Sequence, residues 1–408
     1  PDTLAQLFAE ERNIRTPRDD FRSCLLNAAL QFYYRPDATH GYLLAGYPWF
    51  GVRARDLFIA LPGCTIYADA PERFYRIMDT VLPDMRAFMR QEGISKEIRN
   101  INEGDIGLWA IWTLQEYARW SSLPDMVSRY GDFLDELIHY YLRNVHPNLR
   151  IDDNGLCVMT GDGRPLSWMD AKVNGQAVVR REGYLVEVNA LWYNALCFYR
   201  EALPQKWTPE LEELLGRVQQ SFCDTFINQH GYLFDYVHPH SSWRDWSVRP
   251  NMVFATSLPY SPLPKATRRS VLEIITRELR TPKGLRSLSP KSDGYQPQCH
   301  GTQWQREQSY YNGSVWPWLL GPYFEACIKL YGRSAISFIE NTLIGMEEEL
   351  QQHGVGTVSE LFDGNPPFKG RGAISFAMSV GELLRSLALL EEAKSKYDTQ
   401  ILPIIRYE

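Results

Sequence analysis

Two carboxylates stand out because each lies among residues that are otherwise apolar or small. Asp170 follows the segment 166–169 (sequence LSWM), and Glu360 lies within 358–364 (VSELFDG). The charged form of a carboxylate is costly to remove from water, so each group needs partners or a shifted pKa. Two carboxyl groups in different surroundings can supply one protonated acid and one ionised base, the pair that hydrolysis of a glycosidic bond requires. The structural alternative is that Asp170 caps a helix and Glu360 pairs with a surface arginine.

The composition of the chain argues against several classes of binding partner. The chain has 408 residues, of which 44% are hydrophobic and 23% charged, so it can bury a large core. Its net charge is -6 and no block of Lys and Arg occurs, so neither nucleic acid nor an anionic membrane surface is an expected partner. No apolar run approaches the roughly 20 residues that span a bilayer. Aromatic residues, at 13%, suit both stacking on sugar rings and a helical core.

Cysteine and histidine usage argues against a disulfide framework and a metal site. The seven cysteines are scattered and never spaced as CxxC, which is typical of reduced thiols in a cytoplasmic protein. His238 and His240 form the only local histidine pair, and no neighbouring carboxylate or cysteine completes a ligand set. We therefore expect no bound metal.

The elements that must position the two carboxylates are mostly helices. Apolar periodicity and helix start signals predict about twelve helices in six antiparallel pairs, which favours an all-α (α/α)6 barrel with a cleft at one rim and short β-hairpins in the rim loops. The region 147–182, rich in Gly, Asp and Asn, is expected to be a long functional loop or hairpin that holds Asp170. Helices are expected, among others, at 55–61, 104–120, 123–141, 186–203, 208–228, 249–258, 265–279, 310–331, 335–351 and 374–393.

The expected domain organisation has three parts. Residues 1–15 are expected to be a linker or the remnant of a preceding N-terminal region, 16–395 the helical domain, and 396–408 a C-terminal tail. Because the chain begins at Pro1 without Met, we expect it to be a fragment or processed product with sequence missing upstream.

Seven short blocks occur in order along nearly the whole chain, from about residue 41 to 392. They are AGYPWF at 45–50 with RD at 55–56 and IALPG at 59–63, SWMDA at 167–171, VEVNALWYNAL at 186–196, RPN at 249–251, GLRSL at 284–288, NGSVWPW at 312–318, and SELFDG at 359–364. Together these blocks resemble the C-terminal glucosidase domain of glycogen debranching enzymes.

The resemblance implies an (α/α)6 barrel with amylo-α-1,6-glucosidase activity and no metal or organic cofactor. The family's general acid falls on Asp170 and its general base on Glu360. The acid would protonate the glycosidic oxygen of an α-1,6-linked glucose stub while the base activates water on the opposite face, so the anomer would be inverted, and the carboxyl groups would lie about 6.5–9.5 Å apart. The implied partners are a branched α-glucan such as glycogen or limit dextrin, and a preceding N-terminal domain.

Further residues are candidates for substrate binding by their type. Trp49, Trp168 and Trp316 offer flat faces to pyranose rings, or fill the barrel. Arg55 and Asp56 can form hydrogen bonds with hydroxyls of the terminal glucose, or form an internal ion pair. The polar pairs Glu187 with Asn189 and Arg249 with Asn251 face the cleft or form a buried network. Asp105, Arg181, Tyr311 and Asn312 complete the predicted set.

Several positions depart from the family pattern. Arg53 and Ala54 replace a usual Trp-Gly, Tyr311 replaces a common His, and Phe376 and Met378 stand where Gln and Trp are usual. We favour an active enzyme with altered or narrowed substrate preference. The alternatives are a non-catalytic glucan-binding relative and another (α/α)6 enzyme such as a trehalase or a glycoside phosphorylase, although Glu360 at the base position argues against a phosphorylase.

Overall fold

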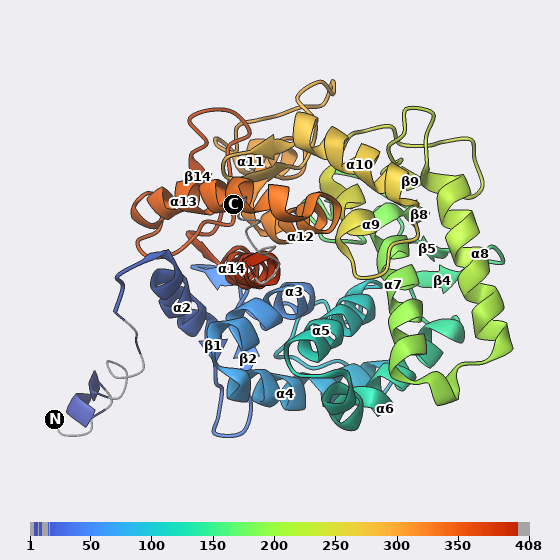
Figure 1. The fold of residues 1–408 in the computed structure, drawn as a ribbon, viewed down its shortest axis with the longest axis horizontal. Helices are drawn as coiled ribbons and strands as arrows, with labels where there is room; N and C mark the ends of the chain where they lie inside the picture. Colours follow the sequence, from blue (N-terminus) through green and yellow to red (C-terminus); the bar gives the residue numbers. More distant parts are fainter. Residues whose placement is uncertain (1–3, 7, 10–14, 16, 399–408) are drawn as a thin grey trace, which may run out of the picture.

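Helices in two concentric layers make up most of the molecule (Figure 1). The computed structural model describes residues 4–6, 8–9, 15 and 17–398. Within these residues, six helices form an inner ring in which each packs against the next and the last packs against the first. They are α3 (Ala54–Cys64), α5 (Ile106–Trp120), α7 (Val186–Ala202), α9 (Phe254–Ser257), α12 (Leu320–Tyr331) and α14 (Ala377–Asp398). The predicted all-α fold of the (α/α)6 type is confirmed.

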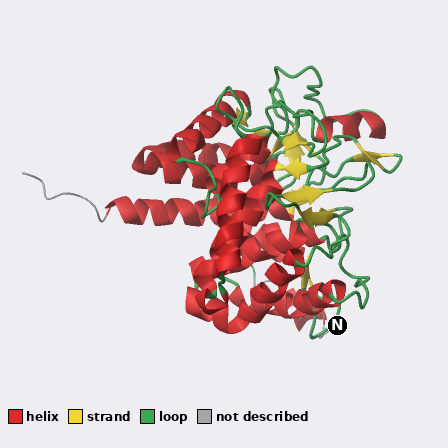
Figure 2. Ribbon diagram, turned by 90° about the vertical axis from the view of Figure 1, so that its right-hand side faces the viewer, coloured by secondary structure: helices red, strands yellow, loops and turns green. Residues whose placement is uncertain are grey.

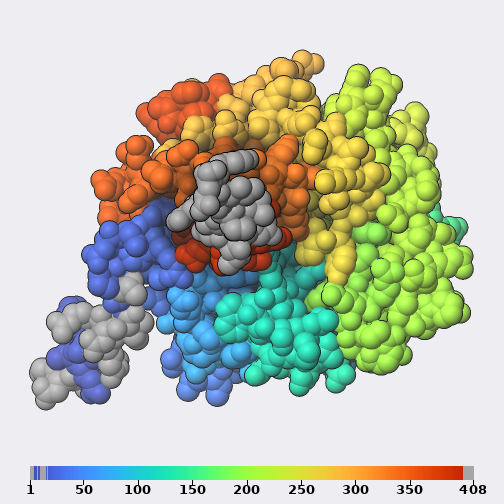
Figure 3. Space-filling view, viewed as in Figure 1, coloured from blue at the N-terminus to red at the C-terminus, as the bar shows by residue number. Residues whose placement is uncertain are grey.

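The outer layer consists of the helices that alternate with these in sequence. They are α2 (Phe21–Phe32), α4 (Pro71–Met89), α6 (Leu123–Leu142), α8 (Pro209–Phe226), α10 (Lys265–Glu278) and α13 (Ile336–Glu347). In Figure 3 the colours follow one another around the molecule, so that the blue segment of α2 lies beside the orange and red C-terminal segments. Among the described residues, no helix combines the length and the apolar character needed to cross a membrane.

Burial patterns explain which helices line the ring. Every residue of α3 is buried, as are nearly all residues of α7, because these helices are covered on all sides. By contrast, α8 buries Leu211, Leu214, Leu215, Val218 and Phe222, which lie three or four residues apart on one face. A single apolar stripe is the pattern of a helix with one face toward the core and one toward water.

The ring closes where α3 meets α14 at two glycines. A Cβ atom added to Gly63 would lie 1.9 Å from the carbonyl oxygen of Gly381, a distance that no side chain tolerates. Glycine at these positions therefore allows the two backbones to come into contact.

Helix α3 contains Pro62, although the sequence predicted that the helix ends just before this proline. Pro62 has no N–H to donate to the carbonyl of Phe58, the residue four positions earlier. The hydroxyl of Thr113 on α5 donates to that carbonyl instead, at 2.7 Å, so the helix continues to Cys64. The expected end at residue 61 was wrong because a neighbouring helix supplies the missing hydrogen bond.

Short strands gather with the loops at one end of the ring (Figure 2). Five of them form an antiparallel sheet in the order β10 (Arg280–Thr281), β11 (Gly284–Arg286), β12 (Val315–Trp316), β13 (Leu361–Phe362) and β14 (Gly370–Arg371). The paired strands are β1 (Tyr33–Tyr34) with β2 (Tyr42–Leu43), β3 (Gly46–Tyr47) with β15 (Ser375–Phe376), β4 (Leu149–Ile151) with β5 (Cys157–Met159), β6 (Lys172–Val173) with β7 (Gln176–Ala177), and β8 (Tyr184–Leu185) with β9 (Tyr236–Val237). The predicted rim hairpins are confirmed.

The helix predicted at 310–331 was wrong in its first part. A separate helix, α11 (Gln303–Tyr310), ends where that helix was expected to start, and β12 and a 3-10 turn precede α12. Gly313 adopts a positive φ of 155°, and Val315 pairs with Phe362 in the sheet, so the chain is extended here. Apolar periodicity at 315–320 does not distinguish a short buried strand from a helix.

The domain boundaries stay predictions. Residues 399–408 and most of 1–15 lie outside the described residues, and α14 runs through to Asp398.

Candidate active site

Asp170 and Glu360 lie in loops at the strand-bearing end of the ring. Asp170 precedes β6 in the long segment 147–182, which carries β4 to β7, and Glu360 immediately precedes β13. Arg53, the N-cap residue of α3, lies between this loop region and the ring. The fold thus brings residues from three distant parts of the chain to one place.

Asp170 is partly exposed and accepts hydrogen bonds on both oxygens. The guanidinium of Arg53 donates to Oδ2, and the hydroxyl of Tyr311 donates to Oδ1 at 2.9 Å. The Asp170 side chain is 23% exposed, so a ligand can reach it from solvent. The predicted helix-cap alternative for Asp170 does not describe these contacts.

Glu360 is buried and is held mainly by neutral groups. The amide of Ala373 donates to Oε2 at 2.7 Å, and the hydroxyl of Tyr310 lies 3.4 Å from the same oxygen. Burial raises the pKa of Glu360 to about 8, although the Ala373 amide and the charge of Arg53 act in the opposite direction. Gly372 permits this packing, because a Cβ atom there would lie 2.2 Å from Oε2.

Adjacent tyrosines connect the two carboxylates. Tyr311 contacts Asp170 and Tyr310 contacts Glu360, and their ring centroids are 6.1 Å apart. The ring of Tyr311 stacks on Trp316 at 5.2 Å with an interplanar angle of 3°, which fixes its orientation. Tyr311 therefore takes a defined position beside Asp170.

The indole of Trp168 lies edge-on to this stack. Its centroid is 5.2 Å from that of Tyr311 and 5.3 Å from that of Trp316. Phe376 adds another edge contact to Trp316, at 6.4 Å. Both tryptophans are almost fully buried, so they support the tyrosine in the ligand-free protein.

Arg53 also contacts a second carboxylate. Its Nε lies 3.4 Å from Oδ2 of Asp56, and its guanidinium lies 5.3 Å from the centroid of the Phe50 ring. Burial raises the pKa of Asp56 above its ordinary value, with Arg53 opposing this shift. Arg53 thus links Asp56, on the first turn of α3, to Asp170.

Arg55 forms its ion pair with Asp105 and not with Asp56, the partner that the sequence suggested. The guanidinium of Arg55 donates to both oxygens of Asp105 at 2.8 Å and also contacts Glu103. The indole of Trp109 donates to Asp105 as well, at 3.2 Å. Arg55 and Asp105 are almost fully buried, and burial raises the pKa of Glu103 to about 7.

Arg181 and Glu187 belong to a buried network behind Asp170. Arg181 donates to both oxygens of Glu187, at 2.5 and 2.7 Å, and to Asp235 at 2.6 Å. Asp235 accepts from Asn251 at 2.7 Å, and Asn251 in turn accepts from the Trp168 indole at 2.6 Å. The network fixes the loop that ends in Asp170.

Asn189 and Arg249 also contact the protein. Asn189 exchanges hydrogen bonds with the backbone of Cys157 at 2.7 and 3.0 Å, which fastens β5 to α7. Arg249 donates to the carbonyl of Tyr311 and to the side chain of Asn312, the latter at 3.1 Å. These contacts match the buried-network alternative, and direct contact of these residues with substrate stays a prediction.

Trp49 differs from the other predicted aromatic residues in its exposure. Its side chain is 60% exposed, in the turn between β3 and α3. It is close in sequence to Arg53 and is free to offer a ring face to a ligand.

The sequence did not identify two residues of the site. Arg53 was noted only as a departure from the family, and Tyr310 was assigned to a helix with no role. The signal for Tyr310 was its position next to Tyr311, and the signal for Arg53 was an unexpected charge beside two predicted site residues. Burial also raises the pKa of Glu307, a further carboxylate, and the charge of Asp170 acts in the same direction.

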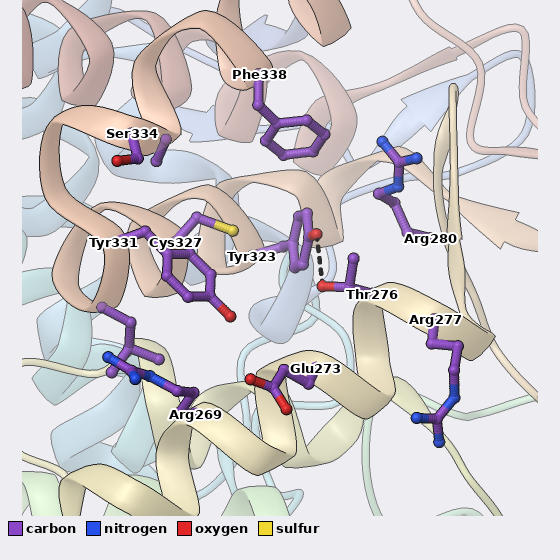
Figure 4. A pocket seen from close by; sticks show the side chains of 12 residues that line it. Arg269, Glu273, Thr276, Arg277, Arg280, Tyr323, Cys327, Tyr331, Ser334 and Phe338 are labelled. Atoms are coloured by element: carbon purple, nitrogen blue, oxygen red, sulfur yellow. Dashed lines mark hydrogen bonds between the residues drawn. The ribbon is translucent and has the colours of Figure 1, made fainter.

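A cavity of about 700 Å³ lies away from this site, between α10, α12 and α13 (Figure 4). Arg269, Glu273 and Arg280 surround it together with the rings of Tyr323 and Phe338. Its residues include none of those predicted for the site. Within the described part of the chain, no group of three or more His, Cys, Asp and Glu side chains is arranged to hold a metal ion.

Comparison with known proteins places residues 27–385 in the family described as amylo-alpha-1,6-glucosidase. No curated protein sequence matches the chain. A solved GH63 mannosylglycerate hydrolase from Thermus thermophilus, in complex with Tris, is 13% identical with a TM-score of 0.62 over 90% of this chain and 99% of that chain. A glycosidase variant in complex with glucose is 14% identical with a TM-score of 0.58 over 91% and 97%. These structures share the fold.

Proposed function

The chain belongs to the amylo-alpha-1,6-glucosidase family, and we propose that it is an inverting glycoside hydrolase with Asp170 as general acid and Glu360 as general base. The acid transfers a proton to the glycosidic oxygen as the bond from that oxygen to C1 breaks. The base removes a proton from water as the water oxygen bonds to C1 from the opposite face. Hydrolysis of an α-glycoside by this route therefore releases the sugar as its β-anomer.

The observation that supports these roles is the contrast between the two carboxylates. Asp170 is partly exposed and can meet a ligand, whereas Glu360 is buried against a backbone amide and a tyrosine hydroxyl. Because burial raises the pKa of Glu360 to about 8, Glu360 acts as the base in its ionised form, and we expect the rate to rise as pH increases towards about 8.

We propose single α-1,6-linked glucose stubs of a branched α-glucan as the substrate. Family membership supports this substrate, and the fold neighbour bound to glucose supports a glucosyl group in the site. Trp49 would contact the polymer next to the cleaved bond, because its exposed ring can stack on a pyranose. The expected cytoplasmic location and a preceding N-terminal domain stay predictions.

The test is glucose release, without added phosphate, from a dextrin that bears single α-1,6-glucosyl stubs. The protein is compared with Asp170→Asn and Glu360→Gln, and NMR follows the first anomer formed. β-Glucose from the unaltered protein alone supports the proposal. α-Glucose as the first product contradicts inversion. Dextrin binding by all three proteins with no release indicates a non-catalytic glucan-binding relative.

A further inference from the structure

Helix α11 (Gln303–Tyr310) carries an exposed tryptophan close to its start. The side chain of Trp304 is 58% exposed, and it lies about one turn before Glu307 and two turns before Tyr311. Burial increases along the helix, from residues 301–306, which are all exposed, to Ser309 and Tyr311, which are buried. The helix therefore runs from solvent at Trp304 into the candidate site at its other end.

Both ends of α11 are fixed to the protein. At its start, the amide of Gln305 donates to the hydroxyl of Thr302 at 3.3 Å, and the amide of Thr302 donates to the Gln305 side chain at 2.8 Å. These reciprocal bonds form a capping box. At its end, the hydroxyls of Tyr310 and Tyr311 contact the two carboxylates of the site. The position of Trp304 is therefore defined relative to both carboxylates.

Trp304 shares a face of the helix with residues that lie beside Asp170. Residues at i, i+3 and i+7 fall on one side of an α-helix, so Trp304, Glu307 and Tyr311 are aligned. Tyr311 contacts Asp170 directly, and α11 contacts β6, the strand that follows Asp170. The carboxyl group of Glu307 senses the charge of Asp170 as well. Trp304 therefore extends this face outward, about 10 Å along the helix axis from Tyr311.

The order of exposure indicates which part of a substrate reaches Trp304. Glu360 is 3% exposed, the side chain of Asp170 is 23% exposed, and that of Trp304 is 58% exposed. In the proposed reaction, Asp170 protonates the oxygen that joins the terminal glucose to the leaving group, while Glu360 acts on the opposite face of that glucose. The leaving group thus extends from Asp170 toward solvent, the direction in which Trp304 lies.

The side chains on this face suit a neutral sugar chain. An indole offers a broad apolar face on which the C–H groups of a pyranose ring can stack. Glu307 and Gln308, which lie three and four residues after Trp304, supply hydrogen-bond acceptors and donors for sugar hydroxyls. A ring flanked by such polar groups matches a ligand that is apolar on its faces and polar around its edge.

We propose that Trp304 binds the main chain of the branched glucan on the leaving-group side of Asp170, by stacking on a glucose unit beyond the branch point. This inference rests on the proposed hydrolysis and deepens it. It predicts that a stub carried on a chain of several glucose units is a better substrate than a glycoside with a short leaving group.

The first experiment varies the length of the leaving group. It compares isomaltose, whose leaving group is one glucose, with maltopentaose that bears a single α-1,6-glucosyl stub on its central unit. In Trp304→Ala, we expect the ratio of kcat/KM for the branched substrate to that for isomaltose to fall about tenfold, mainly through a higher KM for the branched substrate. Trp304→Tyr, which keeps a flat ring, should retain the ratio within about threefold, whereas Trp304→Leu should lose it as Trp304→Ala does.

Trp120→Ala is the matched control. Trp120 is also a surface tryptophan, 39% exposed, but it is the last residue of α5. It lies about 20 Å along that helix from Asp105, which is at the end of the ring that carries the site. Its substitution should leave the substrate ratio unchanged. An equal fall of the ratio in Trp120→Ala and Trp304→Ala overturns the assignment to Trp304.

A second measurement detects the chain without catalysis. Calorimetry measures the binding of maltoheptaose, a linear chain with no stub to cleave, to the unaltered protein, Trp304→Ala and Trp120→Ala. We expect Kd to rise about tenfold in Trp304→Ala alone. Equal Kd values in the three proteins, or no binding to the unaltered protein, overturn the proposal.

The outcomes separate this inference from the proposed function. Cleavage of both substrates with an unchanged ratio in Trp304→Ala overturns stacking by Trp304 and leaves the hydrolase proposal intact. Weaker binding of maltoheptaose to Trp304→Ala, with no cleavage of either substrate by the unaltered protein, supports the glucan site and contradicts the hydrolase proposal.

Discussion

Two clusters of charged side chains, one at the strand-bearing end of the ring and one between inner helices, differ in how their charges are paired. The site cluster consists of Arg53, Asp56, Asp170 and Glu360. The ring cluster lies further along α5, α12 and α14 and consists of Glu116, Glu325, Glu382 and Arg385. Its side chains are at most 5% exposed, whereas those of Arg53 and Asp170 are 18% and 23% exposed.

In the ring cluster, one guanidinium contacts all three carboxylates. Arg385 lies 2.8 Å from oxygens of both Glu382 and Glu325 and 3.7 Å from Glu116, and it also lies over the Trp112 ring. Arg119 and Lys329 provide two more cations for Glu325. This cluster joins three helices, and its side chains are almost fully buried.

A shifted pKa does not distinguish the two clusters. Burial raises the pKa of Glu382 to about 7, although it has a bidentate arginine, and raises that of Glu360 to about 8. The difference lies in partners and access. Glu360 is held by an amide and a tyrosine hydroxyl, and its neighbour Asp170 is open to solvent. Perturbed titration identifies a site only together with these features.

The two clusters should differ most in how their substitution affects activity. We expect Asp170→Asn and Glu360→Gln to reduce kcat/KM by at least about 1000-fold, because each removes one of the two proton transfers of the proposed mechanism. Glu382→Gln, measured below its unfolding temperature, should stay within about threefold of the unaltered protein. A comparable loss in folded Glu382→Gln would show that the ring cluster takes part in the chemistry.

Substitutions in the ring cluster should lower the stability of the fold more than substitutions in the site cluster. Arg385→Met leaves three buried carboxylates without their shared cation, so the free energy of unfolding should fall by about 3–5 kcal/mol. Arg53→Met should cost less than half of this, because water can reach Asp170. Urea denaturation measures both changes. Equal losses would mean that the site cluster is as important to the fold as the ring cluster.

The buried proton on Glu360 predicts a pH-dependent stability difference. Its pKa is about 8 in the native state against an ordinary value of 4.5, so between these values the native protein holds a proton that the unfolded chain has lost. Stability from this group is full below pH 4.5 and decreases as pH rises to about 8. Glu360→Gln lacks this loss and should become more stable than the unaltered protein by on the order of 2 kcal/mol above about pH 8. Thermal unfolding at about pH 5 and about pH 8.5 measures the difference, and an unchanged gap would contradict the burial argument.

The smallest effect on the fold is expected at the exposed edge of the site. Trp49→Ala should change the free energy of unfolding by no more than about 0.5 kcal/mol, since its side chain is 60% exposed. KM for the stub-bearing dextrin should rise about threefold to tenfold through loss of stacking. An unchanged KM would remove Trp49 from the substrate-binding set.

Much of the fold could be predicted from local pattern. Helix α8 lies where its sequence indicates, because a helix with one face toward the core shows a regular apolar periodicity. The strand at Val315–Trp316 was missed since two buried residues carry too little pattern. The end of α3 was predicted too early, at Pro62, because the hydroxyl of Thr113 that replaces the missing hydrogen bond is distant in sequence.

The sequence drew attention to Asp170 and Glu360, whose catalytic roles stay predictions, but it did not indicate their hydrogen-bond partners. Asp170 and Glu360 stand out in apolar surroundings, whereas the pairing of Arg53 with Asp170 depends on how two loops meet across 117 positions. Glu187 and Asn189 show a further limit. A polar residue in an apolar helix gives the same pattern whether it faces a cleft or, as Glu187 does, a buried arginine.

The contact of α14 with α3 bears on how the protein folds as it is synthesised. The ring closes between residues 54–64 and 377–398, so the first inner helix emerges from the ribosome long before its partner at Gly381. Until then, the apolar surface of α3 opposite α5 lacks its native cover and is available to chaperones or to other nascent chains. Glu360 is synthesised only shortly before α14, so ring closure and the meeting of Asp170 with Glu360 fall at the same late stage of translation.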